Sequence, residues 1–141
     1  MTVLIFDFDG TIADTLETIV TITNRLASHY GYPQTTPERL RYLRALSTAE
    51  LLEQSNVPLF QVPFLMRRVR RELHQDIGSI QVFQRLADVL LALTADGHTI
   101  MIASSNAPST ICPFLERHGL KEIFSQIYGN IGLLGKARSL R

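Results

Sequence analysis

The sequence predicts an α/β protein built on a parallel sheet, and three observations indicate that fold class. Apolar runs without polar alternation, at residues 3–6 and 98–103, are typical of strands buried on both faces of such a sheet. Helical patterns follow both runs, and a third, shorter strand is predicted at 124–128. Acidic or small polar residues stand where the first two strands end. Strands that alternate with helices favour a parallel sheet with crossover helices.

The segment between the first two strands begins with a helical insert. Its predicted helices span about 15–29, from 36 onward, from 47 onward and 63–75. Gly31 and Pro33 end the first of them. Thr36 before Pro37 supplies a capping hydroxyl and a proline at the first helical position, and Ser-Thr-Ala-Glu at 47–50 has the capping-box pattern.

Two further helices are predicted to connect the three strands. Apolar residues at helical spacing predict a helix over 82–95, which Gly97 ends. Pro108 stands near the start of the next helix, which is predicted to run to about residue 118 with Gly119 as its cap. The predicted order is therefore strand, helical insert, helix, strand, helix, strand.

The composition is that of an ordinary globular protein. The 141 residues are 45% hydrophobic and 19% charged, with a formal net charge of +1, so no overall basic surface indicates a nucleic-acid partner. No apolar run approaches the roughly 20 residues that span a bilayer, and no basic leader precedes the first strand. The single cysteine, Cys112, excludes an intrachain disulfide and fits a reducing compartment, which favours a cytoplasmic protein.

Two groups of residues that could suggest binding sites are interpreted as structural. Arginines cluster at 67, 68, 70 and 71, but Glu72 and Asp76 share the predicted helix, which favours a solvated face. The four histidines, at positions 29, 74, 98 and 118, show no spacing typical of metal ligands.

The first strand ends in two carboxylates placed two residues apart, Asp7 and Asp9. Asp7 could attack phosphorus and form an aspartyl-phosphate, and Asp9, on the same face of an extended chain, could protonate the leaving oxygen and then activate water. Gly10 would let the backbone approach a phosphate, Thr11 offers a hydroxyl, and the helix that begins next favours an anion. The competing interpretation is an ordinary Asp-Gly turn, although charged groups beside a buried strand are costly without a partner.

The run Asp-Phe-Asp-Gly-Thr-Ile-Ala-Asp-Thr at 7–15 resembles the first motif of the haloacid dehalogenase-like hydrolases, in the variant shared by phosphoglycolate phosphatases and β-phosphoglucomutases. This resemblance implies a Rossmann-like parallel sheet core into which a mobile α-helical cap is inserted. We therefore expect residues 1–13 and 82–141 to form a discontinuous core and residues 14–81 to form the cap.

The second strand ends in Ser104, Ser105 and Asn106. Their hydroxyls and the N–H groups at the following helix start could hold a phosphoryl group. From the residues alone, Ser105 or Asn106 is slightly better explained as the cap of the helix that begins near Pro108. The resemblance favours phosphate binding and implies that Ser104 is the serine of the second motif, with Ser105 as the alternative one residue away.

Two cations complete the expected site. Lys136 follows a glycine-containing segment, but a phosphate-loop motif would need glycine at Asn130 and a hydroxyl residue at Ala137. The resemblance implies instead that Lys136 is the lysine of the third motif and neutralises phosphate oxygens. Arg44, in the expected cap, could bind an anionic leaving group, although a surface arginine is the simpler interpretation.

These residues predict a phosphatase that acts on a small phosphorylated metabolite with Mg²⁺ as its cofactor. The Asp7 carboxylate and the Asp9 carbonyl oxygen are the expected metal ligands. The alternative activities are a phosphomutase of the same family and, less favoured because Asp9 is present, a dehalogenase.

The acidic motif that the resemblance places after a fourth strand is absent from these 141 residues. This absence predicts a C-terminally truncated core, and it leaves open a non-catalytic module for binding or assembly. It also predicts that the edge of the first strand is exposed, so that the chain either self-associates there or depends on a lost C-terminal segment.

Overall fold

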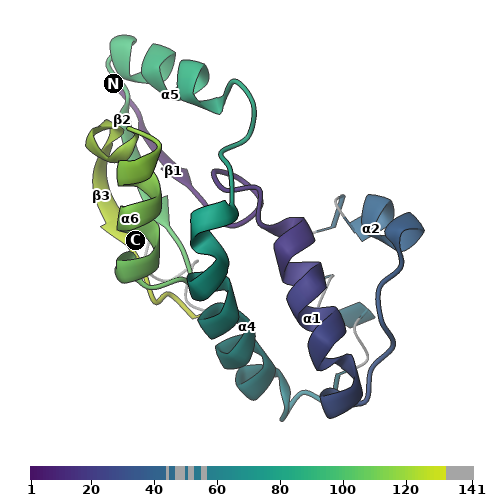
Figure 1. Ribbon diagram of the computed structural model, residues 1–141. Coiled ribbons are helices and arrows are strands. Elements are labelled where there is room, and N and C mark those ends of the chain that lie inside the picture. The colour runs from purple at the N-terminus through teal and green to yellow at the C-terminus, as the bar shows by residue number, and fades with distance from the viewer. Residues whose placement is uncertain (44, 47–49, 51–52, 55–56, 133–141) are drawn as a thin grey trace. The chain divides into compact units, whose positions relative to one another are not determined.

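Figure 1 shows the computed structural model, which describes residues 1–43, 45–46, 50, 53–54 and 57–132. The elements in chain order are β1 (Val3–Phe6), α1 (Leu16–Tyr30), α2 (Pro37–Leu43), α4 (Val62–Asp76), η1 (Ile77–Ser79), α5 (Leu86–Ala95), β2 (Thr99–Ala103), α6 (Pro108–Arg117), η2 (Lys121–Ile123) and β3 (Phe124–Tyr128). The chain divides into two compact units. Unit 1 is Met1–Thr15 with Ile77–Arg141, and unit 2 is Leu16–Asp76.

Unit 1 contains a parallel sheet with the strand order β1-β2-β3. Leu4 pairs with Ile100 and Phe6 with Ile102, so β1 and β2 end at the same edge of the sheet. Because parallel strands need crossover connections, α5 joins β1 to β2 and α6 joins β2 to β3. The predicted α/β class with a parallel sheet is confirmed.

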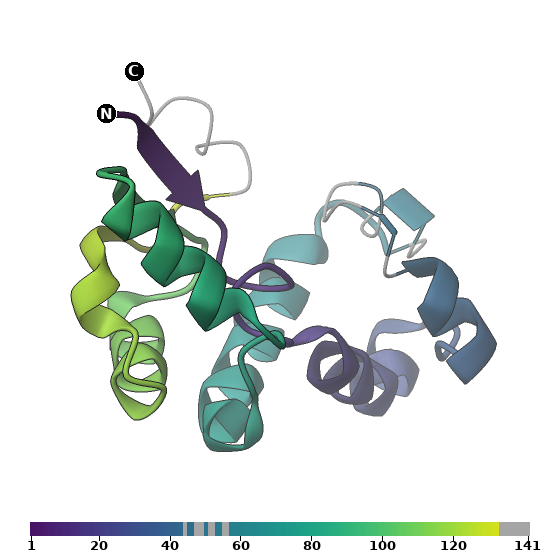
Figure 2. The same cartoon turned by 90° about the horizontal axis from the view of Figure 1, so that it is seen from above.

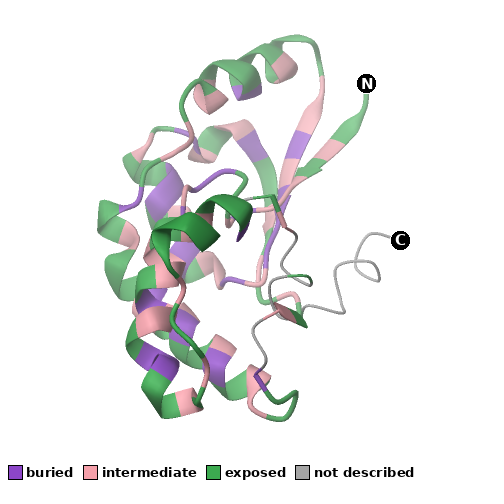
Figure 3. Ribbon diagram, turned by 90° about the vertical axis from the view of Figure 1, so that its right-hand side faces the viewer, coloured by how far each residue is buried: buried purple, intermediate pink, exposed green. Residues whose placement is uncertain are grey.

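One face of the described sheet is much better covered than the other. Figure 2 shows α5 and α6 on the same side of β1, as right-handed crossovers along a 1-2-3 strand order require. Ile100 and Ile102 are buried, whereas Val3 and Ile5 remain 51% and 41% exposed. Figure 3 shows the strand next to the N-terminus in the colours of exposed and intermediate residues. The expectation that the first strand is buried on both faces is therefore wrong for the described part of the chain, because its helices cover a single face.

The chain leaves and re-enters unit 1 along two adjacent segments. Ala13 forms an isolated antiparallel bridge with Val82, and the Asp14 N–H donates to the Gln81 carbonyl oxygen at 2.9 Å. The helix predicted over 82–95 is therefore too long, since α5 begins only at Leu86. The apolar spacing of Val82 fits a helix, but the bridge to Ala13 holds Val82 in an extended conformation.

Arg117 at the end of α6 holds the re-entering segment against that helix. Its guanidinium donates to the carbonyl oxygens of Ile77 at 2.9 Å and Ile80 at 2.7 Å. The same group lies 5.4 Å from the centre of the Phe114 ring, within the range of a cation–π contact. These contacts satisfy carbonyl groups just after the end of α4, where the helical hydrogen bonds stop.

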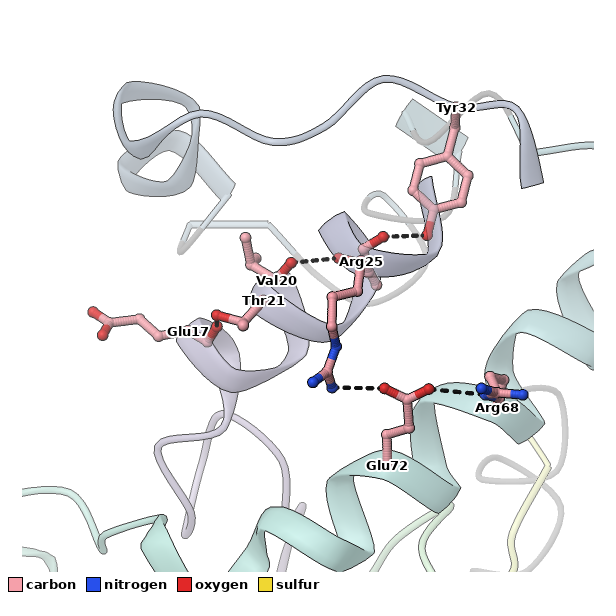
Figure 4. A network of polar contacts seen from close by, with 8 residues as sticks. Glu17, Val20, Thr21, Arg25, Tyr32, Arg68 and Glu72 are labelled. Carbon is pink, nitrogen blue, oxygen red and sulfur yellow. Dashed lines mark hydrogen bonds and ion pairs between the residues drawn. The ribbon is translucent and has the colours of Figure 1, made fainter. Parts of the chain in front are cut away.

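Unit 2 is built on the antiparallel pair α1 and α4, which agree with the predicted helices 15–29 and 63–75 to within one residue. Their buried side chains recur at helical spacing: Ile22, Leu26 and Ala27 on α1, and Leu65, Val69 and Leu73 on α4. Glu72 of α4 accepts hydrogen bonds from Arg25 of α1 at 2.6 Å and from Arg68 at 2.8 Å (Figure 4). The pairing of Arg68 supports the structural interpretation of the arginine cluster.

The segment after α1 is held to that helix by polar contacts. The Asn24 carboxamide donates to the Thr35 carbonyl oxygen at 2.9 Å and accepts the Thr35 N–H at 2.7 Å. The Tyr32 hydroxyl donates to the Thr23 carbonyl oxygen at 2.7 Å (Figure 4), and burial raises the pKa of Tyr32 to about 12. Thr36 caps α2 as predicted, since its hydroxyl oxygen accepts the Arg39 N–H at 3.3 Å.

Three of the four residues of the predicted capping box at 47–50 lie outside the described residues. Among the helices that are described, none combines the length and apolar character needed to cross a bilayer.

We expect Glu72→Gln to lower the free energy of unfolding by about 0.5–1 kcal/mol near neutral pH, because the ion pairs with Arg25 and Arg68 lie at the surface. The hydrogen bond from Arg68 holds the pKa of Glu72 below its ordinary value of 4.5. The stabilisation is therefore present above that ordinary value and is lost as the pH falls through the lower folded-state pKa. Urea unfolding of the wild-type chain and the variant at several pH values measures this stabilisation. A difference in unfolding free energy that does not change with pH would contradict the assignment of the effect to the Glu72 carboxylate.

We also expect the 141-residue chain to self-associate through β1. Within the described residues β1 pairs on one side only, and Val3 and Ile5 are exposed, so a second chain could pair with its edge. The double variant Val3→Lys/Ile5→Lys should shift sedimentation toward the 15.9 kDa monomer. Leu91→Lys, which replaces a similarly exposed apolar residue on α5, is the matched control. A wild-type chain that stays monomeric over the whole concentration range would refute this prediction.

Candidate active site

The loop after β1 is closed around the buried residue Phe8. The Phe8 side chain is fully buried, and its ring packs edge-on against Phe114 of α6 at 5.1 Å between centroids. The Phe8 carbonyl oxygen accepts the N–H groups of Ile12 and Ala13, both at 3.0 Å. Gly10 adopts a φ of 73°, a left-handed conformation that glycine allows without steric cost, and the chain turns there.

Asp7 and Asp9 flank this buried residue. The Oδ1 atom of Asp9 is buried, so the burial of Phe8 does not expose the whole of that carboxylate. Asp7 and Asp9 are both only partly buried. The Asp7 Oδ1 atom accepts the Phe8 N–H at 2.8 Å, which restrains the carboxylate of the expected nucleophile.

The helix predicted after the first motif is α1, which begins at Leu16, and the N–H groups of residues 10–13 before it are used inside the loop. The Gly10 N–H donates to the Ala13 carbonyl oxygen at 2.9 Å, and the Thr11 N–H donates to the Phe8 carbonyl oxygen at 3.4 Å. Thr11 itself is exposed.

The segment after β2 is held by the residues that follow β3. Ser104 is fully buried; its N–H donates to the Tyr128 carbonyl oxygen at 2.9 Å, and its carbonyl oxygen accepts the Ile131 N–H at 3.0 Å. The Ser104 hydroxyl oxygen accepts the Asn106 N–H at 3.1 Å. Ser105 is half-buried between these two residues.

Asn106 joins this segment to the first motif. Its carboxamide Nδ2 donates to Asp9 Oδ2 at 2.6 Å, across 97 residues of sequence. Asn106 does not cap α6, because the N-cap position is Ala107 and no side chain bonds there. The capping interpretation of Ser105 or Asn106 is therefore wrong, since the Asn106 side chain turns toward the carboxylate.

Gly129 and Asn130 belong to the site, although the sequence analysis missed their contribution. A Cβ atom on Gly129 would lie 2.4 Å from Pro108 Cδ and 2.6 Å from the Asn106 carbonyl oxygen, so a glycine is needed at this close approach. The Asn130 N–H donates to that carbonyl oxygen at 2.9 Å, and Asn130 has a φ of 57°. The Gly-Asn pair after a strand is the sequence signal for such a turn.

The structure thus brings together Asp9, Ser104 and Asn106, with Asp7 at the end of the adjacent strand. Lys136 and Arg44 lie outside the described residues. Their proposed roles, like the phosphate contacts of Gly10, Thr11 and Ser105, remain predictions.

The donor chemistry at the end of β1 fits Mg²⁺. In the part of the chain that is described, no three His, Cys, Asp or Glu side chains group closely enough to hold a metal ion. Mg²⁺, however, is commonly bound through one or two carboxylates, with substrate phosphate and water as the other ligands. The Asp7 carboxylate and the main-chain carbonyl oxygen of Asp9 would supply two oxygens, since one Asp9 carboxylate oxygen already binds Asn106.

An acid pair where a parallel strand ends, beside polar groups from the adjacent strand, is typical of α/β proteins that bind ligands at the carboxyl edge of the sheet. The sequence model of the family described as haloacid dehalogenase-like hydrolase matches residues 4–136. The chain belongs to this family, which confirms the resemblance of residues 7–15 to its first motif.

Individual relatives agree with this membership. The chain is 34% identical over 140 residues to a phosphoglycolate phosphatase of Synechococcus elongatus, in an alignment that covers 99% of this chain and 66% of the relative. It is 25% identical to a phosphoglycolate phosphatase of Chromobacterium violaceum, with 88% and 60% covered. A predicted phosphatase from Clostridium acetobutylicum has the same fold, with a TM-score of 0.73 at 20% identity and coverage of 96% and 63%. The chain thus spans 59–66% of the length of its curated relatives.

We expect Gly129→Ala to lower the free energy of unfolding by about 1–3 kcal/mol, because the added methyl group overpacks a contact with Pro108 and the Asn106 backbone. Gly132→Ala is the matched control, since a Cβ there meets no atom within 4 Å. Urea unfolding of both variants measures the difference. Equal stabilities of the two variants would show that Gly129 is not constrained by this approach.

Proposed function

We propose that this chain is part of a Mg²⁺-dependent phosphatase that hydrolyses a small phosphomonoester, with phosphoglycolate as the first substrate to test. The observation that carries the proposal is the hydrogen bond between Asp9 and Asn106, which joins the acid pair of β1 to the polar segment of β2. The 34% identity to a phosphoglycolate phosphatase supports the reaction class and the choice of substrate.

In the proposed reaction Asp7 is the nucleophile. A carboxylate oxygen of Asp7 attacks phosphorus, the bond from phosphorus to the ester oxygen breaks, and Asp9 gives its proton to the departing alkoxide. Water then attacks the aspartyl-phosphate and passes a proton to Asp9, which releases phosphate and restores both residues. The hydrogen bond from the Phe8 N–H restrains the Asp7 carboxylate that attacks.

Phosphate binding is assigned to polar groups around the acid pair. The Ser104 hydroxyl uses its oxygen to accept the Asn106 N–H and keeps its own hydrogen for a phosphoryl oxygen. Ser105 and the exposed Thr11 hydroxyl are further candidate donors. Lys136 is proposed to neutralise the phosphate charge, and the turn at Gly10 allows a close approach.

Mg²⁺, held by Asp7 and the carbonyl oxygen of Asp9, would screen the charge between the carboxylate and the phosphate. The helical residues 14–81 are proposed to act as the cap, with Arg44 as a contact to the anionic part of the substrate. The single Cys112 and a small-metabolite substrate support a cytoplasmic location.

Phosphate release measured on the full-length protein tests the proposal. We expect turnover of phosphoglycolate that depends on Mg²⁺ and that Asp7→Asn abolishes, because an amide is a far weaker nucleophile than a carboxylate. Asp88→Asn, which alters an exposed carboxylate on α5, should leave turnover unchanged.

Other outcomes separate the alternatives. Isomerised sugar phosphate without released phosphate would identify a phosphomutase. Full activity of Asp7→Asn would refute the nucleophile assignment. Binding of phosphorylated ligands without turnover in the full-length protein would favour a non-catalytic module.

A further inference from the structure

Asn106 has an unusual place among the polar residues that follow β2. Its side chain is 2% exposed, yet its carboxamide reaches Asp9, which stands at the end of a different strand. The 2.6 Å distance from Nδ2 to Oδ2 is short for a nitrogen–oxygen hydrogen bond, as is typical when the acceptor is charged. The contact therefore restrains a carboxylate that the proposed reaction requires to transfer protons.

The polar groups of Asn106 argue against a direct role in binding phosphate. Its backbone N–H donates to the Ser104 hydroxyl, and its backbone carbonyl oxygen accepts the Asn130 N–H. One of the two carboxamide N–H groups donates to Asp9, and the residue is only 2% exposed, so little of the carboxamide can reach a ligand. A buried residue with these contacts organises its neighbours instead of meeting the ligand.

We infer that Asn106 is a positioning residue that restrains the carboxylate of Asp9 for proton transfer. This inference rests on the proposed phosphatase function and replaces the phosphate-binding role predicted for Asn106. The hydrogen bond holds Oδ2, and Oδ1 is buried, so both oxygens of this carboxylate have a fixed place in the structure.

The backbone around Asn106 gives this contact a fixed geometry. Gly129 packs against Pro108 and the Asn106 carbonyl oxygen, and Asn130 donates to the same oxygen at 2.9 Å. The Ser104 hydroxyl holds the N–H side of the residue. Asn106 is thus restrained on both sides of its backbone, and its carboxamide can orient Asp9 with little loss of conformational entropy.

The leaving group provides the test. Loss of an alkoxide needs a proton, whereas 4-nitrophenolate leaves readily without one, so a defect in the general acid affects alkyl esters most. kcat/KM is the appropriate measure because it reports the steps up to departure of the leaving group. In the full-length protein we expect Asn106→Ala to lower kcat/KM for phosphoglycolate at least about tenfold more than for 4-nitrophenyl phosphate.

A double-mutant comparison tests whether the effect acts through Asp9. If it does, Asn106→Ala should leave the ratio of the two kcat/KM values unchanged in an Asp9→Asn background. Asn106→Ser, whose side chain is too short to reach Asp9, should show the same larger loss of kcat/KM for phosphoglycolate. This variant replaces the alanine variant if the latter does not fold. Ser125→Ala on β3, away from the acid pair, is the control that should leave the ratio unchanged.

The outcomes separate this inference from the proposed function. Equal losses on both esters, with weaker inhibition by inorganic phosphate, would show that Asn106 binds phosphate and would overturn the positioning role alone. A further change of the ratio in the Asp9→Asn background would also overturn it. Absence of Mg²⁺-dependent turnover in the wild-type protein, or full activity of Asp7→Asn, would overturn the proposed function and the inference with it.

Discussion

Burial of the Phe8 side chain is the constraint on which the candidate site depends. Full burial of a phenylalanine stabilises a fold by about 1.5–3 kcal/mol, and here the ring also meets Phe114 edge-on. Asp7 precedes Phe8 and Asp9 follows it, so the same event fixes the backbone on which both acids stand. The Phe8 carbonyl oxygen then closes the loop by accepting three N–H groups, those of residues 11–13. Burial of one apolar side chain therefore fixes the backbone that carries both carboxylates.

The parallel register brings the second half of the site to the loop around Phe8. Phe6 lies opposite Ile102, so the chain beyond each strand emerges at the same edge, and residues far apart in sequence can touch there. The Asp9 carboxylate and the Asn106 carboxamide make such a contact. The chemistry proposed for the family motif thus depends on a side chain outside that motif.

Local sequence patterns predicted the helices and strands well. The features that they did not predict depend on contacts between residues far apart in the sequence. Strand runs and helical spacing located β2, β3, α1 and α4 because both are periodic along the chain. Val82 was placed in a helix because its bridge to Ala13 leaves no periodic signal. Asp7 and Asp9 could be named from their spacing, but the partner of Asn106 could not, because capping and phosphate binding both fitted its local sequence. Lys136 and Arg44 remain sequence predictions.

The hydrogen bond between Asn106 and Asp9 also explains why a glycine is needed at the end of β3, although a glycine offers no side chain to the reaction. A Cβ on Gly129 would collide with Pro108 and with the Asn106 carbonyl oxygen, so any larger residue must displace the turn that carries Asn106. Displacement of that turn would alter the geometry of the hydrogen bond to Asp9, and hydrogen bonds weaken steeply as their geometry worsens. A continuous series of contacts thus joins the packing after β3 to a carboxylate that follows β1. The acid geometry is consequently a property of all three strands and not of the first motif alone.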